Sequence, residues 1–145
     1  MNKKIIFIDL DGTFFNDKRV PTEANIKAIK HAKAKGHEIV FATGRSYSFI
    51  ESINKQCGNV SRFAISGAGC IIYDMEKQKV IQSTLIPKPT VEAITKLDHP
   101  EITWFFHCID GSFSNLENFP FQNGTAKHFT QPVTEFAQTK SVCQL

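Results

Sequence analysis

The sequence contains no long apolar run and no closely spaced cysteines. No segment approaches the ~18 consecutive apolar residues of a membrane-spanning helix. The apolar run after the N-terminal lysines ends at Asp9, too early for a secretory signal. We therefore expect a cytoplasmic protein without a membrane partner. The cysteines form no C-x-x-C pair, which argues against zinc ribbons and disulfide frameworks and favours free thiols. They are Cys57, Cys70, Cys108 and Cys143.

The chain also has no large excess of positive or negative charge. The formal net charge is +3 and the sequence pI is about 8.7, too weakly basic to indicate a nucleic-acid partner. Hydrophobic residues make up 41% of the chain and charged residues 21%, as in globular proteins. A length of 145 residues accommodates one ordinary domain, or a small domain plus part of another.

The first 74 residues alternate between buried-strand and helix patterns. Continuous apolar runs predict strands within 5–9, 37–45 and 62–74. Segments 21–35 and 46–58 have helical spacing, and a glycine closes each. Strand–helix–strand–helix–strand implies a parallel sheet with right-handed crossovers. The predicted fold class is therefore α/β.

The pattern changes after Asp74. Residues 75–90 indicate a hairpin or extended segment, and 91–99 a short helix. Segment 102–110 alternates between two faces. Its expected core side is formed by Ile102, Trp104, Phe106 and Cys108. The aromatic run of Trp104, Phe105 and Phe106 fits a core, or a surface that contacts a substrate. Residues 111–145 show no periodicity, and we assign no elements there.

Each of the three predicted strands ends in a polar turn: "DLDGT", "ATGRS" and "SGAG". In a parallel α/β sheet, ligands bind at the carboxyl ends of the strands, so we expect these turns to meet. Carboxylates suit a divalent cation. Backbone amides and hydroxyls at a helix N-terminus suit a phosphate.

These turns lie in motifs that resemble one known family. "DLDGTFF", "FATGR" and "SGAGCIIYD" resemble the haloacid dehalogenase (HAD) superfamily of phosphatases, and more narrowly its Cof-type branch. The resemblance implies a partial HAD-type Rossmann-like core, with parallel strands and flanking helices, over residues 1–82. Part of an α/β cap would come next, over residues 83–145.

The resemblance also implies roles for the two aspartates. Asp9 would be the nucleophile that forms an aspartyl-phosphate. Asp11 would be the general acid that protonates the leaving alkoxide and then the base that activates water. The Asp9 carboxylate and the Asp11 backbone carbonyl would bind Mg²⁺. The implied substrate is a small phosphorylated metabolite.

The remaining predicted site residues surround the phosphate. The phosphate-binding group implied by the resemblance is Gly12, Thr13, Thr43, Gly44 and Arg45. Thr43 has an alternative as a helix N-cap, and Arg45 has one as a surface salt bridge. Ser66 and Gly67 lie where Cof-type proteins contact substrate, although those proteins commonly carry asparagine at the Ser66 position. Substrate contact there stays open.

The sequence departs from the family on the C-terminal side of the cap. A full member carries a further lysine and a G-D-x-x-N-D-like acidic loop, whereas the dipeptide G-D occurs nowhere in this sequence. We therefore expect weak or no activity from the chain alone, and its status as an enzyme stays open. One alternative is a non-catalytic phosphate- or metal-binding module, and another is one half of a split two-chain enzyme.

The first strand is central in this fold, so here one of its edges would lack a partner from the same chain. Because an unpaired apolar strand favours association, we expect a homodimer or a complementary C-terminal chain.

Overall fold

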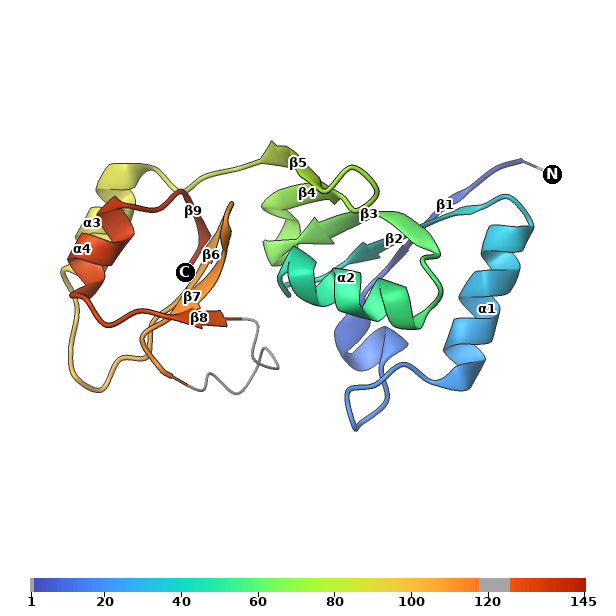
Figure 1. The fold of residues 1–145 in the computed structure, drawn as a ribbon, viewed down its shortest axis with the longest axis horizontal. Helices are drawn as coiled ribbons and strands as arrows, with labels where there is room; N and C mark the ends of the chain where they lie inside the picture. The colour runs from blue at the N-terminus through green and yellow to red at the C-terminus, as the bar shows by residue number, and fades with distance from the viewer. Residues whose placement is uncertain (1, 118–125) are drawn as a thin grey trace. The chain divides into compact units, whose positions relative to one another are not determined.

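The computed structural model describes residues 2–117 and 126–145. The chain divides into two compact units, unit 1 over Met1–Gln82 and unit 2 over Ser83–Leu145 (Figure 1). Among the described residues, no helix has the length and apolar character needed to cross a membrane.

Unit 1 is built on a five-stranded sheet in which neighbours in space follow the order of the chain. Strands β1, β2 and β3 are parallel, as predicted, and β4 returns antiparallel to β3. The elements are β1 (Ile5–Ile8), η1 (Leu10–Phe14), α1 (Glu23–Ala34), β2 (Glu38–Ala42), α2 (Tyr47–Gln56), β3 (Ser61–Ser66), η2 (Gly67–Gly69), β4 (Ile71–Asp74) and β5 (Lys79–Ser83).

The two helices of unit 1 cover the same face of its sheet. The crossovers β1–α1–β2 and β2–α2–β3 both step in one direction across parallel strands, and right-handed crossovers then place both helices on one side. Facing side chains form the core there, with Phe41, Ile50 and Ala64 fully buried. This order also makes β1 an edge strand within unit 1, with β2 as its paired strand.

Local side chains determine where the helices begin. The Thr22 hydroxyl accepts a hydrogen bond from the Asn25 N–H and caps α1. The Ser46 hydroxyl accepts one from the Phe49 N–H and caps α2. The N-cap role considered for Thr43 is therefore wrong, because α2 begins later along the chain.

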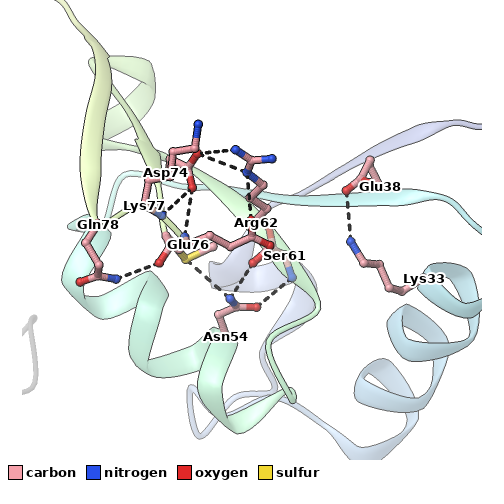
Figure 2. Close-up of polar contacts among 10 residues, drawn as sticks. Lys33, Glu38, Asn54, Ser61, Arg62, Asp74, Glu76, Lys77 and Gln78 are labelled. Atoms are coloured by element: carbon pink, nitrogen blue, oxygen red, sulfur yellow. Dashed lines mark hydrogen bonds and ion pairs between the residues drawn. The ribbon is translucent and has the colours of Figure 1, made fainter.

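Polar contacts fix the β4–β5 turn and α2 to the start of β3 (Figure 2). The buried Asn54 amide donates to the Ser61 carbonyl and accepts from the Ser61 N–H, at 2.7 and 3.0 Å. Arg62 donates from Nη2 and Nε to one Asp74 carboxylate oxygen, at 2.8 and 3.2 Å. These hydrogen bonds, together with backbone N–H groups of the turn, lower the pKa of Asp74 to about 2.

Unit 2 is a four-stranded sheet in the order β8-β7-β6-β9, with two helices that pack on each other. Its elements are α3 (Lys88–Thr95), β6 (Phe105–Cys108), β7 (Gly111–Ser114), β8 (Ala126–His128), α4 (Val133–Gln138) and β9 (Val142–Gln144). The core is rich in aromatic rings and includes Phe106, Phe113 and Phe136. The rings of Phe106 and Phe136 lie 5.3 Å apart between centroids.

Three expectations for unit 2 need correction or completion. The helix expected at 91–99 is α3, which begins at Lys88 because a proline is compatible with the first helical turn. Trp104, Phe106 and Cys108 lie in the core as predicted, but Ile102 is 37% exposed because the strand begins only at Phe105. Within 111–145, where no element was predicted, lie β7, β8, α4 and β9; residues 118–125 fall outside the described part.

Candidate active site

The first site loop begins where β1 ends. Asp9 has an extended backbone, with φ −76° and ψ 153°, and its side chain is exposed beyond the strand. The next residue, Leu10, is fully buried, and Phe14 is 3% exposed at the other end of the loop. The Phe14 ring packs on Phe41 of β2, with 5.5 Å between centroids. Leu10 and Phe14 therefore hold the loop, while Asp9 and residues 11–13 face solvent.

Gly12 gives this loop its turn. Asp11 has φ −76° and ψ 125°, and Gly12 has φ 74° and ψ −1°. These are the central dihedrals of a type II turn, which requires a left-handed residue at its third position. A Cβ atom on Gly12 would meet nothing within 4 Å, so the backbone conformation alone favours glycine there. Thr13 comes directly after the turn and is exposed.

Asn25 supports the loop from α1. Its side-chain Nδ2 donates to the Phe14 carbonyl at 2.8 Å. The sequence did not single out this residue, because an asparagine in the first turn of a helix gives no sign of a distant partner.

Arg45 joins the second site loop to the first. Its Nε and Nη2 donate to the two carboxylate oxygens of Asp11, each at 2.6 Å. The Arg45 side chain is only 10% exposed, and its guanidinium carbon lies 4.2 Å from the centroid of the Phe49 ring. The salt-bridge alternative for Arg45 is therefore confirmed, but its expected surface position is wrong, because Arg45 is buried. Its partner Asp11 is 46% exposed.

This ion pair determines the charge state of Asp11. Its hydrogen bonds with Arg45 lower the pKa of the Asp11 carboxyl against a smaller opposing effect of burial. Asp11 is therefore an ionised hydrogen-bond acceptor in this conformation, with its carboxylate occupied by the guanidinium.

The second and third site loops are joined by backbone hydrogen bonds. The Thr43 N–H donates to the Ile65 carbonyl at 3.0 Å, and the Ala68 N–H donates to the Thr43 carbonyl at 3.2 Å. The Gly67 N–H donates to the Arg45 carbonyl at 3.1 Å. Through these bonds and the Asp11–Arg45 pair, the structure brings the three predicted loops together.

The other predicted site residues differ in their solvent exposure. Gly44 is exposed, and a Cβ atom there would meet nothing within 4 Å, so a ligand can approach its backbone. Thr43 is 7% exposed, and its Oγ1 accepts a long hydrogen bond of 3.4 Å from the Arg45 N–H. Ser66 is 1% exposed, and its hydroxyl has no hydrogen-bond partner. Gly67 is buried with a left-handed φ of 57°.

The part of the chain that the structure describes offers few oxygen ligands for a metal. Among residues 2–117 and 126–145, no three His, Cys, Asp or Glu side chains cluster as metal ligands. The exposed Asp9 carboxylate is available, whereas Arg45 occupies the Asp11 carboxylate. Mg²⁺ commonly uses one or two carboxylates and completes its shell with waters and substrate phosphate. The exposed Asp9 carboxylate fits this requirement as a single protein ligand.

Comparison with known proteins assigns the family. Residues 6–142 match the haloacid dehalogenase-like hydrolases. The chain belongs to this family. The resemblance inferred from the motifs is thereby confirmed, and so is the α/β fold class.

Two curated relatives and one solved structure illustrate the likeness. Phosphatase YwpJ of Bacillus subtilis strain 168 is 30% identical over 109 residues, which are 75% of this chain and 37% of that protein. The 5-amino-6-(5-phospho-D-ribitylamino)uracil phosphatase YcsE of the same strain is 37% identical over 71 residues, 49% of this chain and 28% of that protein. The structure of BT4131, a HAD subclass IIB sugar phosphatase, has a TM-score of 0.77 at 23% identity.

These matches differ in how much of each protein they cover. The BT4131 match covers 97% of this chain but 56% of that structure, and its low sequence identity supports the fold alone. The chain spans little more than a third of the length of the first curated relatives that it matches.

Proposed function

We propose that this chain carries the nucleophile and the phosphate-binding loops of a Mg²⁺-dependent phosphoric-monoester hydrolase. The observation that carries the proposal is the exposed Asp9 carboxylate at the end of β1. Arg45 joins its loop to the second polar loop, and backbone hydrogen bonds join the second loop to the third. Membership of a hydrolase family whose curated relatives are phosphatases supports it.

The proposed first step forms a bond between an Asp9 carboxylate oxygen and phosphorus. The bond from phosphorus to the leaving alkoxide breaks, and Asp11 donates a proton to that alkoxide. In the second step Asp11 takes a proton from a water, whose oxygen attacks the aspartyl-phosphate and releases inorganic phosphate and the Asp9 carboxylate. Mg²⁺, held by the Asp9 carboxylate and the Asp11 backbone carbonyl, would offset the negative charge of both reactants.

The phosphoryl oxygens need donors from this chain. We assign the Thr43 hydroxyl and the backbone N–H groups of Gly12, Thr13 and Gly44 to them, because stabilising this charge is the main task in phosphoryl transfer. Arg45 acts on Asp11 in this scheme. While Arg45 binds Asp11, the carboxylate has no proton to give, so Asp11 must leave the guanidinium before it can act as the acid.

The substrate we propose is a small phosphorylated metabolite in the cytoplasm. The names of two relatives, a 5-amino-6-(5-phospho-D-ribitylamino)uracil phosphatase and a pyridoxal phosphate phosphatase, describe compounds of this kind. We assign unit 1 as the core and unit 2 as part of a cap. Ser66 and Gly67 are the core residues proposed to contact the substrate.

A second candidate is a phosphate- or metal-binding module without turnover. One observation favours it: Arg45 holds the Asp11 carboxylate, so the residue proposed as general acid is already engaged. In that case Asp9 and Thr43 would serve as ligands only.

Hydrolysis of an aryl phosphate separates the two candidates. We would compare the whole chain with Asp9→Asn, with and without Mg²⁺, and use Asp17→Asn as the matched control. The enzyme proposal predicts Mg²⁺-dependent phosphate release that Asp9→Asn abolishes and Asp17→Asn retains. Equal, background release from all three proteins would contradict it. Thermal stabilisation by Mg²⁺ plus phosphate, lost in Asp9→Asn, would then identify the binding module.

A further inference from the structure

A cavity of about 320 Å³ lies at the amino end of β3 in unit 1, the end opposite to the third site loop. All of its lining residues fall within 51–78. They come from the second half of α2, the beginning of β3 with the residues just before it, and the turn between β4 and β5. Unit 1 therefore forms this cavity from one continuous stretch of its own chain.

The polar groups on the buried wall of the cavity already have hydrogen-bond partners. Asn54 and Ser61 are each 4% exposed. The Asn54 amide bonds both the N–H and the carbonyl of Ser61, and its Nδ2 also lies 3.7 Å from the Met75 sulfur (Figure 2). Because these groups are satisfied within the chain, recognition of a ligand depends on the charged groups nearer the solvent.

Two opposite charges line the cavity without pairing with each other. Glu51 and Lys55 are four residues apart on α2, the spacing at which Glu and Lys form ion pairs on a helix. On α1 the equivalent pair, Glu23 and Lys27, is formed at 3.8 Å. On α2 the Glu51 carboxylate instead accepts a hydrogen bond of 2.6 Å from the Gln78 side chain. Lys55 has no ion pair within the described part of the chain, so the cavity presents an ammonium beside a carboxylate.

The charges of the cavity select a small zwitterion. A simple anion would meet the carboxylates of Glu51 and Glu76, and a simple cation would meet the ammonium of Lys55. A ligand that carries both charges close together can pair with Lys55 and Glu51 at once, since side chains at this helical spacing are neighbours. An α-amino acid has its ammonium and its carboxylate on one carbon atom. Asn59 and Gln78 also line the cavity and add amide groups that can donate and accept hydrogen bonds.

We propose that this cavity binds a free α-amino acid, with its carboxylate on Lys55 and its ammonium on the Glu51 carboxylate. The side chain of the ligand packs against Met75, whose flexible thioether accommodates apolar groups of different shapes. The cavity contains none of the residues assigned to phosphoryl transfer, so this proposal does not rest on the proposed function.

Backbone amide NMR of the whole ¹⁵N-labelled chain tests the site. The common L-amino acids are added one at a time at about 10 mM, which populates even a millimolar site. We expect at least one of them to shift amide signals within 51–78 and to leave those of 9–13 and 43–45 in place. For the amino acid that binds best, the matching amine without the carboxylate and the matching acid without the ammonium should each bind about tenfold more weakly, because each leaves one charge of the cavity unpaired.

Variants of the two charges test how the ligand is held. Lys55→Gln and Glu51→Gln should each weaken binding about tenfold, since each removes one charged partner. Lys27→Gln and Glu23→Gln make the same changes in the ion pair of α1 and should leave binding as in the wild type. Far-UV circular dichroism checks that each variant is folded.

Three results would overturn the proposal. The first is that no amino acid shifts the amide signals within 51–78. The second is that the matching amine or the matching acid binds as tightly as the amino acid. The third is that Lys55→Gln or Glu51→Gln binds the amino acid as tightly as the wild-type chain does.

Discussion

Arg45 holds Asp11 by two hydrogen bonds of 2.6 Å while its guanidinium lies against the ring of Phe49. The bidentate geometry needs the planar guanidinium, and the aromatic contact fixes the orientation of that group. The pair connects two loops that lie 34 residues apart in the sequence. It therefore determines both where the Asp11 carboxylate points and how readily it binds a proton.

Replacement of Arg45 should raise the pKa of Asp11. Arg45→Ala removes both hydrogen bonds and the nearby positive charge, so the pKa should return toward the ~3.9 of an unperturbed aspartate. Arg45→Lys keeps a charge but cannot bind in bidentate fashion, so it should give a smaller rise. Carboxyl ¹³C NMR titration measures this pKa. Arg62→Ala, which removes the partner of Asp74, should leave Asp11 unchanged; an Asp11 pKa unaffected by Arg45→Ala would show that the contact is absent in solution.

Gly12→Ala should destabilise the protein by about 1–2 kcal/mol, because an L-residue is forced into the left-handed region. Nothing lies within 4 Å of the added Cβ, so steric crowding adds nothing. Gly44→Ala is the matched control, since its site is equally open and its φ lies outside that region. Urea unfolding measures both variants. Equal free energies of unfolding for the two would contradict the assigned turn.

The Arg62–Asp74 pair should make stability depend on pH at acidic values. The folded-state pKa of Asp74 is about 2, below the ~3.9 expected in the unfolded chain. Its contribution to the free energy of unfolding is therefore complete above about pH 4 and is lost as the pH falls toward 2. Urea midpoints across this range should fall less steeply for Asp74→Asn than for wild type. The exposed Asp17→Asn variant should follow the wild-type dependence of the urea midpoint on pH. If Asp74→Asn follows it too, the Arg62–Asp74 pair contributes nothing to the pH dependence of stability.

Phe106→Ala should destabilise unit 2 by about 3–5 kcal/mol, because a fully buried ring is removed from the aromatic core. Phe105→Ala removes a ring from the neighbouring position on the other side of the strand, where the side chain is half-buried. It should cost clearly less. Thermal unfolding of the two variants distinguishes them, and equal losses would contradict the assignment of strand faces.

The sequence predicted the parts of the fold that depend on local pattern. The apolar runs before Asp9 and Thr43 identified parallel strands. Burial on both faces is confirmed for β2, but it is wrong for β1 within unit 1, where Ile5 and Phe7 are 60% and 61% exposed. Unit 2 was harder to predict. Its strands β7 to β9 have three or four residues each, too short for a period to be visible, and β9 pairs with β6 across the intervening β7, β8 and α4.

The sequence predicted where the candidate site lies but not how its side chains are arranged. The order of strands and turns predicts that the three loops meet, since this is a consequence of parallel topology. The pairing of Arg45 with Asp11 is not such a consequence, because side-chain direction depends on the packing of Phe49 and Phe15 around the guanidinium. The orphaned hydroxyl of Ser66 likewise emerges only once β3 is buried.

Binding of trifluoroberyllate, a tetrahedral mimic of a carboxyl-bound phosphoryl group, tests the central claim most directly. It requires no turnover, so it applies even if the chain alone hydrolyses nothing. We expect ¹⁹F NMR signals of the bound mimic to appear with Mg²⁺, disappear with a chelator, and be absent in Asp9→Asn. Asp17→Asn should bind as wild type does. A wild-type chain that binds no mimic in the presence of Mg²⁺, or an Asp9→Asn variant that binds it equally well, would contradict the assignment of Asp9 as the phosphoryl acceptor.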